Sequence, residues 1–145
     1  MVKTANIKIN QTPEQLAYFA AILDQKGTFY IGEFRQKRNG KVDTYWRSIL
    51  KVASRDKSFI NSLEQVFGGR INFSGTMYHW QVTGPTLDYI LNIIHSRLTT
   101  KQRQCEIMKR FRLLTDHNTG SKPLEDVVSK KRFLIMKEMK EANSQ

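Results

Sequence analysis

The chain has 145 residues, of which 39% are hydrophobic, so it is long enough and apolar enough for one domain with a hydrophobic core. It contains 24 Lys and Arg against 13 Asp and Glu, giving a net charge of +11, an excess typical of proteins that bind nucleic acid. No run of 18 apolar residues is present and the N-terminus lacks a basic-then-apolar pattern, which argues against a membrane span and a signal peptide.

The first predicted element is a helix over about residues 12–25. Thr12 suits the N-cap, Pro13 the first helical position, and Gln15 completes a capping box. Gly27 is expected to end the helix in a left-handed conformation. The run between is apolar on nearly every side, which is typical of a helix buried all round. We therefore expect two copies of this helix to pack together in a homodimer. The expected interface residues are Ala17, Ala20, Ala21, Leu23 and Asp24.

Strand patterns follow the helix. Residues 28–38 and 41–54 read as two strands, and Asn39–Gly40 between them is a strong hairpin signal. Residues 56–67 have helical spacing and end at Gly68–Gly69. Residues 70–74 and 78–83 alternate as a second pair of strands. Two hairpins joined by a helix predict one four-stranded antiparallel sheet.

Helices dominate the rest of the chain. They are predicted over 86–98, from Thr99 or Thr100 to about 114, and over about 123–142, with a loop over 116–122. The order is αββαββα followed by C-terminal helices, so the predicted fold class is α+β with a single domain over 1–145. Helices should cover one face of the sheet and leave the other polar and open to water.

A polar sheet face on a basic protein is suited to the major groove of DNA, which admits a two-stranded ribbon. Arg and Lys pair with guanine, and Asn and Gln pair with adenine, so a mixture of cations and amides indicates base reading as well as phosphate binding. The predicted DNA-binding residues are Gln36, Lys37, Arg38, Arg47, Lys51, Arg70, Asn72, Ser74, His79 and Gln81.

The segment Phe19-Ala20-Ala21-Ile22-Leu23-Asp24-Gln25-Lys26-Gly27 resembles the nine-residue motif that names the LAGLIDADG homing endonucleases. The order of elements agrees, so the resemblance extends over about residues 12–114. It implies the family's saddle-shaped sheet as the DNA surface. One motif per chain implies a homodimer and a long, pseudo-palindromic double-stranded DNA site.

The resemblance fails at one position. The family's metal-binding acid precedes the final glycine of the motif, and here that position is Lys26. An ammonium cannot ligate Mg²⁺ and repels it. Asp24 remains, at a position that the family uses mainly for structure, and Glu33 is a candidate substitute ligand. Lys101 fits the basic residue of the family's active centre, while Ser54 stands where a glutamine is common, with Arg55 beside it as a candidate basic partner.

Three functions stay open. The first is a sequence-specific double-stranded DNA-binding protein that does not cleave, such as a transcriptional regulator, with no cofactor and no metal. In that protein Lys26 contacts the central phosphates in place of the metal. The second is an active homing endonuclease that uses Mg²⁺, with Asp24 as the metal ligand and Lys26 and Lys101 in the catalytic centre. The third is an RNA-binding intron maturase. The single cysteine, Cys105, excludes an internal disulfide and fits an intracellular location in the cytoplasm, a nucleoid or an organelle.

Overall fold

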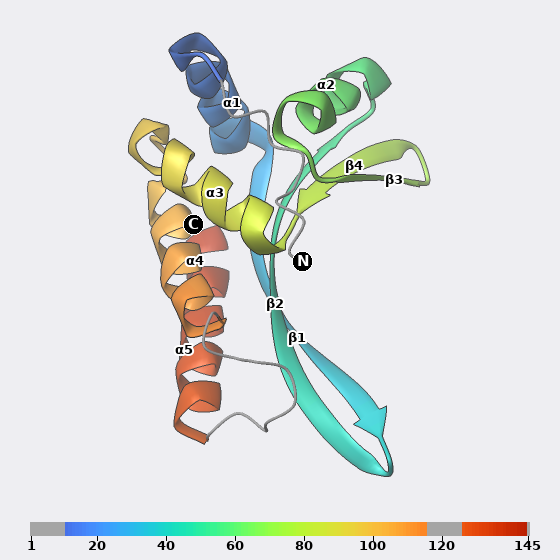
Figure 1. Cartoon of the computed structure of the whole chain (residues 1–145), viewed down its shortest axis with the longest axis vertical. Helices are drawn as coiled ribbons and strands as arrows, with labels where there is room; N and C mark the ends of the chain where they lie inside the picture. Colours follow the sequence, from blue (N-terminus) through green and yellow to red (C-terminus); the bar gives the residue numbers. More distant parts are fainter. Residues whose placement is uncertain (1–10, 116–125, 145) are drawn as a thin grey trace.

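The structure is a computed structural model that describes residues 11–115 and 126–144. Figure 1 shows an antiparallel sheet with the helices gathered on one side of it. The predicted α+β class is confirmed. The elements are α1 (Pro13–Lys26), β1 (Gly27–Arg38), β2 (Lys41–Ser54), α2 (Lys57–Phe67), β3 (Arg70–Ser74), β4 (Met77–Val82), α3 (Gly84–Ile94), the 3₁₀ turn η1 (His95–Arg97), α4 (Gln102–Thr115) and α5 (Asp126–Asn143).

The strands of the described sheet run in the order β1-β2-β4-β3. Asn39 and Gly40 both have positive φ, which matches the twist of a tight hairpin and allows Arg38 to pair with Lys41. The β1–β2 hairpin reaches well beyond β3 and β4 (Figure 1). It therefore offers a long two-stranded surface on the side away from the helices.

The start of α1 is as predicted, but its end is not. The Thr12 hydroxyl accepts a hydrogen bond from the Gln15 backbone N–H, and the Gln15 side chain accepts one from the Thr12 N–H, which completes the capping box. Gly27 is extended, with φ −76° and ψ 140°, so the left-handed conformation expected there is wrong. Glycine is needed for space instead, because a Cβ at this position would lie 2.7 Å from the Leu23 carbonyl oxygen.

The core lies between the sheet and the helices. Trp80 on β4 is fully buried, and its indole N–H donates to the Gly68 carbonyl over 2.7 Å. Phe19 of α1 stacks on Phe67 of α2 and meets Trp80 edge-on. One aromatic cluster thus joins the motif helix, the second helix and the centre of the sheet.

The helix α1 is not buried on every side within one chain. Ala20 and Leu23 lie in the chain's own core, with exposures of 2% and 0%. Both were expected at the dimer interface, and that expectation is wrong because a partner cannot reach them. In the middle of the helix Ala17, Tyr18 and Ala21 are exposed, with Tyr18 at 63%. Tyr18 was not predicted.

The C-terminal helices differ from the prediction in detail. The predicted loop over 116–122 lies outside the described residues, and α5 is described from Asp126. Lys130 and Lys131 are exposed, but Arg132, which follows them in the same basic run, is 2% exposed. Its guanidinium donates to the Leu114 carbonyl and lies over the Phe111 ring. Burial and the nearby Arg112 lower the pKa of Arg132. None of the helices in the described ranges is both long and apolar enough to cross a membrane.

Candidate nucleic-acid interface

The face of the sheet away from the helices collects most of the predicted DNA-binding residues. Because side chains alternate along a strand, the buried residues Phe29, Leu50 and Trp80 fix which positions face the helices. The register then places Lys51, Gln81 and Arg70 in one row across β2, β4 and β3. The next row carries His79 beside Asn72. Gln36, Arg47 and Ser74 share this face and are exposed. We call this surface the open face.

Lys37 does not belong to the open face. It pairs with Val42 and has the same parity along β1 as the buried Phe29 and Ile31, so it points to the reverse side of the hairpin. Its placement among the groove-reading residues is wrong, because a one-residue offset in a strand changes the face. Arg38 has the parity of the open face, but its side chain lies outside the described ones.

Aromatic rings also occupy the open face, and the prediction did not include them. Phe34 and Tyr45 are directly opposite each other on β1 and β2, and their rings stack with centroids 5.6 Å apart. Tyr30 lies on the same face, with the Lys51 ammonium 4.6 Å from its ring centroid. Alternation along each strand predicts this placement. Phe34 and Tyr30 lie an even number of positions from Gln36, and Tyr45 lies two positions from Arg47, so each shares its face.

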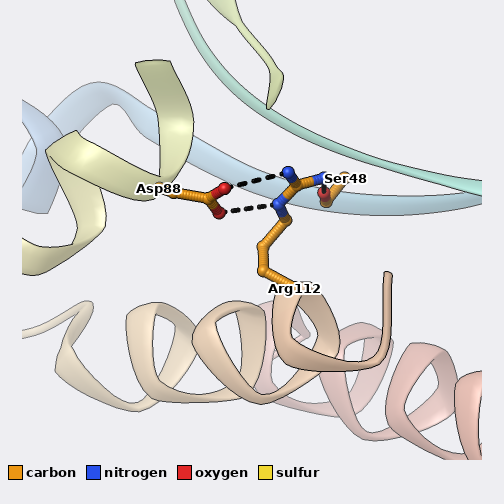
Figure 2. Close-up of polar contacts among 3 residues, drawn as sticks. All are labelled: Ser48, Asp88 and Arg112. Carbon is orange, nitrogen blue, oxygen red and sulfur yellow. Dashed lines mark hydrogen bonds and ion pairs between the residues drawn. The ribbon is translucent and has the colours of Figure 1, made fainter. Parts of the chain in front are cut away.

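A polar cluster ties the helices to the back of this surface (Figure 2). Arg112 of α4 donates to both carboxylate oxygens of Asp88 on α3, over 2.7 and 3.0 Å. It also approaches the Ser48 hydroxyl on β2 at 3.5 Å. Ser48 is buried on the helix side of β2 and directly follows Arg47, whose side chain lies on the open face. The cluster thus supports the strand that carries Arg47.

The foot of α1 is built around Asp24. Its carboxylate accepts hydrogen bonds from the backbone N–H groups of Thr99, Thr100 and Lys101, all at 3.0 to 3.2 Å, and from both threonine hydroxyls. Burial opposes ionisation of the carboxyl group, but the hydrogen bonds outweigh burial, so the pKa of Asp24 is lowered. Asp24 therefore anchors the turn that leads into α4. Asp24 is half-buried, and its place at the dimer interface stays a prediction.

Lys26 lies in a groove between α1 and α2. Its ammonium is 5.3 Å from the centroid of the Phe59 ring, a cation–π contact. The groove has a volume of about 440 Å³. Its lining residues are Tyr18, Ala21, Ile22, Gln25, Lys26, Ser54, Asp56 and Phe59. Asp56 was not predicted as a site residue; it caps α2 by accepting from the Phe59 N–H.

The residues at this foot do not fit a divalent metal ion. Lys26 brings a positive charge, and both carboxylate oxygens of Asp24 are already hydrogen-bonded. Glu33 lies six residues along β1 from Gly27, about 20 Å at the rise of a strand, so it is too far from the foot to replace the missing acid. Within residues 11–115 and 126–144, no group of three His, Cys, Asp or Glu could hold a metal ion. Of the residues predicted for the catalytic centre, Lys101 is joined to Asp24 by a hydrogen bond from its backbone N–H.

This arrangement of sheet and helices is the fold of the LAGLIDADG homing endonucleases. The homing endonuclease I-CvuI, solved with its DNA target, matches with a TM-score of 0.77 and 14% identity over 89% of this chain and 82% of that one. The archaeal intron-encoded homing endonuclease I-Vdi141I, solved with DNA, matches with a TM-score of 0.75 and 14% identity over 89% and 84%.

A longer protein matches as well. The LAGLIDADG homing endonuclease I-GzeII, solved with its DNA target, matches with a TM-score of 0.63 and 23% identity over 83% of this chain and 43% of that one. No protein-family model and no curated protein matches the sequence. At identities this low, the matches show that the fold is shared. The bound DNA is a feature of the neighbouring proteins' structures.

Proposed function

We propose that this protein binds double-stranded DNA at a specific sequence and does not cut it. The observation that carries the proposal is the open face, where Lys51, Gln81 and Arg70 form one row and His79 and Asn72 the next. This mixture supplies cations for phosphates and guanine together with amides for adenine. The structural neighbours solved with DNA support the same partner.

The foot of α1 supports the absence of cleavage. Metal-dependent cleavage of a phosphodiester needs carboxylates that hold the metal at the scissile phosphates. Here Lys26 occupies the motif position of the family's metal-binding acid. Both carboxylate oxygens of Asp24 accept hydrogen bonds from the turn at 99–101. Lys26 is a phosphate ligand in this proposal, and it supplies part of the positive charge that a metal would have supplied. A protein that occupies a site without cutting it is suited to regulating transcription.

The proposal includes a homodimer joined through the exposed side of α1. Ala17 and Ala21 are small and exposed, so a second helix can approach closely along this side. Tyr18 between them is a large exposed apolar ring. A two-fold dimer presents two open faces, so its site is long and pseudo-palindromic.

The competing function is an active homing endonuclease, which the identity of the structural neighbours favours. The deciding experiment is a selection from randomised duplexes with purified protein in EDTA, followed by addition of Mg²⁺ to the selected duplex. We expect a pseudo-palindromic duplex that stays intact. Cleavage of both strands would show that the enzyme is active. Tighter binding to structured RNA than to any duplex at equal salt would identify an RNA-binding maturase.

Lys26→Asp tests the role of the motif position directly. The substitution returns a carboxylate to the groove that already contains Asp56, so we expect it to allow Mg²⁺-dependent cutting of the selected duplex. Lys26→Gln, which removes the charge without adding a ligand, is the matched control and should weaken binding without cutting. Cutting by the Gln variant would contradict the assignment of Lys26.

A further inference from the structure

Part of the open face is apolar rather than polar, on the stretch of the β1–β2 hairpin beyond its pairing with β4. Phe34 and Tyr45 stack across β1 and β2, and Tyr45 retains 39% exposure. The Arg47 guanidinium lies 5.8 Å from the Phe34 centroid, on the same face. An aromatic pair is thus set among the cations that are expected to meet DNA.

A neighbouring ring on the same face is already covered. The Tyr30 ring lies against Gly32, where a Cβ would come within 2.6 Å of the ring, and Lys51 lies over it. On the open face of this hairpin, the half-buried Phe34 and the exposed Tyr45 are therefore the rings whose apolar surface is available to a ligand. Phe34 carries no polar atom, so it contributes no hydrogen bond to any base.

We infer that the Phe34–Tyr45 pair selects thymine by contact with its C5 methyl group. The methyl is the one apolar feature among the base edges of the major groove, and phenylalanine is a side chain suited to it. This inference rests on the proposed function, since it assigns a base to one part of the same surface. It makes Phe34 a specificity residue, with Arg47 beside it to bind the adjoining phosphate or guanine.

Stacking on an unpaired base is the alternative use of aromatic rings on a four-stranded sheet. It requires a free ring face. Here Phe34 stacks on Tyr45 and also meets Arg47, so two groups already compete for its faces. The rim of the pair is better suited to a methyl group than its faces are to a base.

The test replaces each thymine of the selected duplex in turn by uracil, which differs only in lacking the methyl group. Binding of the wild-type protein should fall about fourfold at one position of each half-site, the loss expected for one buried carbon at about 0.8 kcal/mol. Uracil at the other positions should have little effect. The readout uses unaltered protein, so a folding defect cannot produce it.

Variants of Phe34 and Tyr45 complete the test. In Phe34→Ser, which has no methyl group to place against the base, the uracil effect at that position should disappear. Tyr45→Phe keeps both rings and should preserve the effect. If uracil is tolerated at every position of a selected duplex, or the effect survives in Phe34→Ser, the inference is wrong and the proposed function stands. If no duplex is selected, or single strands bind more tightly, both fail.

Discussion

Asp24 shows how much one side chain can organise. Its carboxylate receives the backbone N–H groups of three successive residues, so it fixes the turn between η1 and α4. We predict that Asp24→Asn lowers the free energy of unfolding by about 2 kcal/mol at neutral pH, since hydrogen bonds to a charged group contribute about that much. Urea unfolding of both proteins measures the difference.

The pH dependence of that difference follows from the lowered pKa of Asp24. A carboxyl group with a lowered folded-state pKa contributes its stability fully above its ordinary value of 3.8 and loses it as the pH falls through the folded value. The gap between wild type and Asp24→Asn should therefore be constant near neutral pH and shrink below about pH 4. Glu64→Gln on the exposed surface of α2 is the control and should leave stability unchanged at pH 7.

At the scale of single residues, the sequence predicted which residues are important better than it predicted what each of them contacts. A short motif locates Asp24, Lys26 and Gly27, because its spacing is local. What Asp24 and Lys26 touch depends on residues outside the motif, Thr99 for Asp24 and Phe59 for Lys26, and that information is absent from the motif. Arg132 illustrates the same limit: a basic triplet looks solvated, yet the packing of α5 on α4 buries its third member.

Between elements, a two-point ion pair of Arg112 and Asp88 joins α4 to α3 (Figure 2). Their side chains are 18% and 35% exposed. We predict a coupling energy of about 2 kcal/mol in a double-mutant cycle of Arg112→Gln and Asp88→Asn. The reason is that an ion pair with two hydrogen bonds and partial burial is stronger than an exposed surface pair. Arg112 also approaches the Ser48 hydroxyl, and the double-mutant cycle cancels the contribution of that contact.

The chain supplies its own control for this measurement. Arg110 and Glu138 join α4 to α5 at 2.7 Å, but their side chains are 54% and 36% exposed. The same cycle at this pair should give less than about 1 kcal/mol. Equal coupling energies at the two pairs would contradict the view that burial strengthens the Arg112–Asp88 pair.

Most of the elements could be predicted because their signals are local. Caps, alternation and the Asn39–Gly40 turn depend on a few neighbouring residues, and the two hairpins were found from them. The face on which a strand residue lies depends on counting from a buried residue, and Lys37 was misplaced for that reason. Alternation along residues 41–54 already puts Tyr45 on the face of Arg47 and Lys51, but its pairing with Phe34 depends on the register of the two strands, which the sequence does not show.

For the whole molecule, the decisive question is whether two chains join through α1. Ala21 is exposed in the single chain, so Ala21→Arg should block a close helix contact while leaving the unfolding free energy within about 0.5 kcal/mol of wild type. We predict that this variant sediments as a monomer and binds a full pseudo-palindromic site no better than one half-site. Gln65→Arg adds the same charge at an exposed position of α2 and should remain a dimer.

Salt separates this dimer contact from the DNA contact. Each chain carries +11, so two chains repel, and salt weakens that repulsion by screening it. Binding to DNA releases counterions from phosphates and weakens as salt rises. Sedimentation should therefore show a tighter wild-type dimer at higher salt, over the range in which DNA affinity falls steeply. A dimer that loosens with salt in parallel with DNA binding would point to subunits held together by charge pairs, which the small and aromatic side chains Ala17, Tyr18 and Ala21 cannot provide.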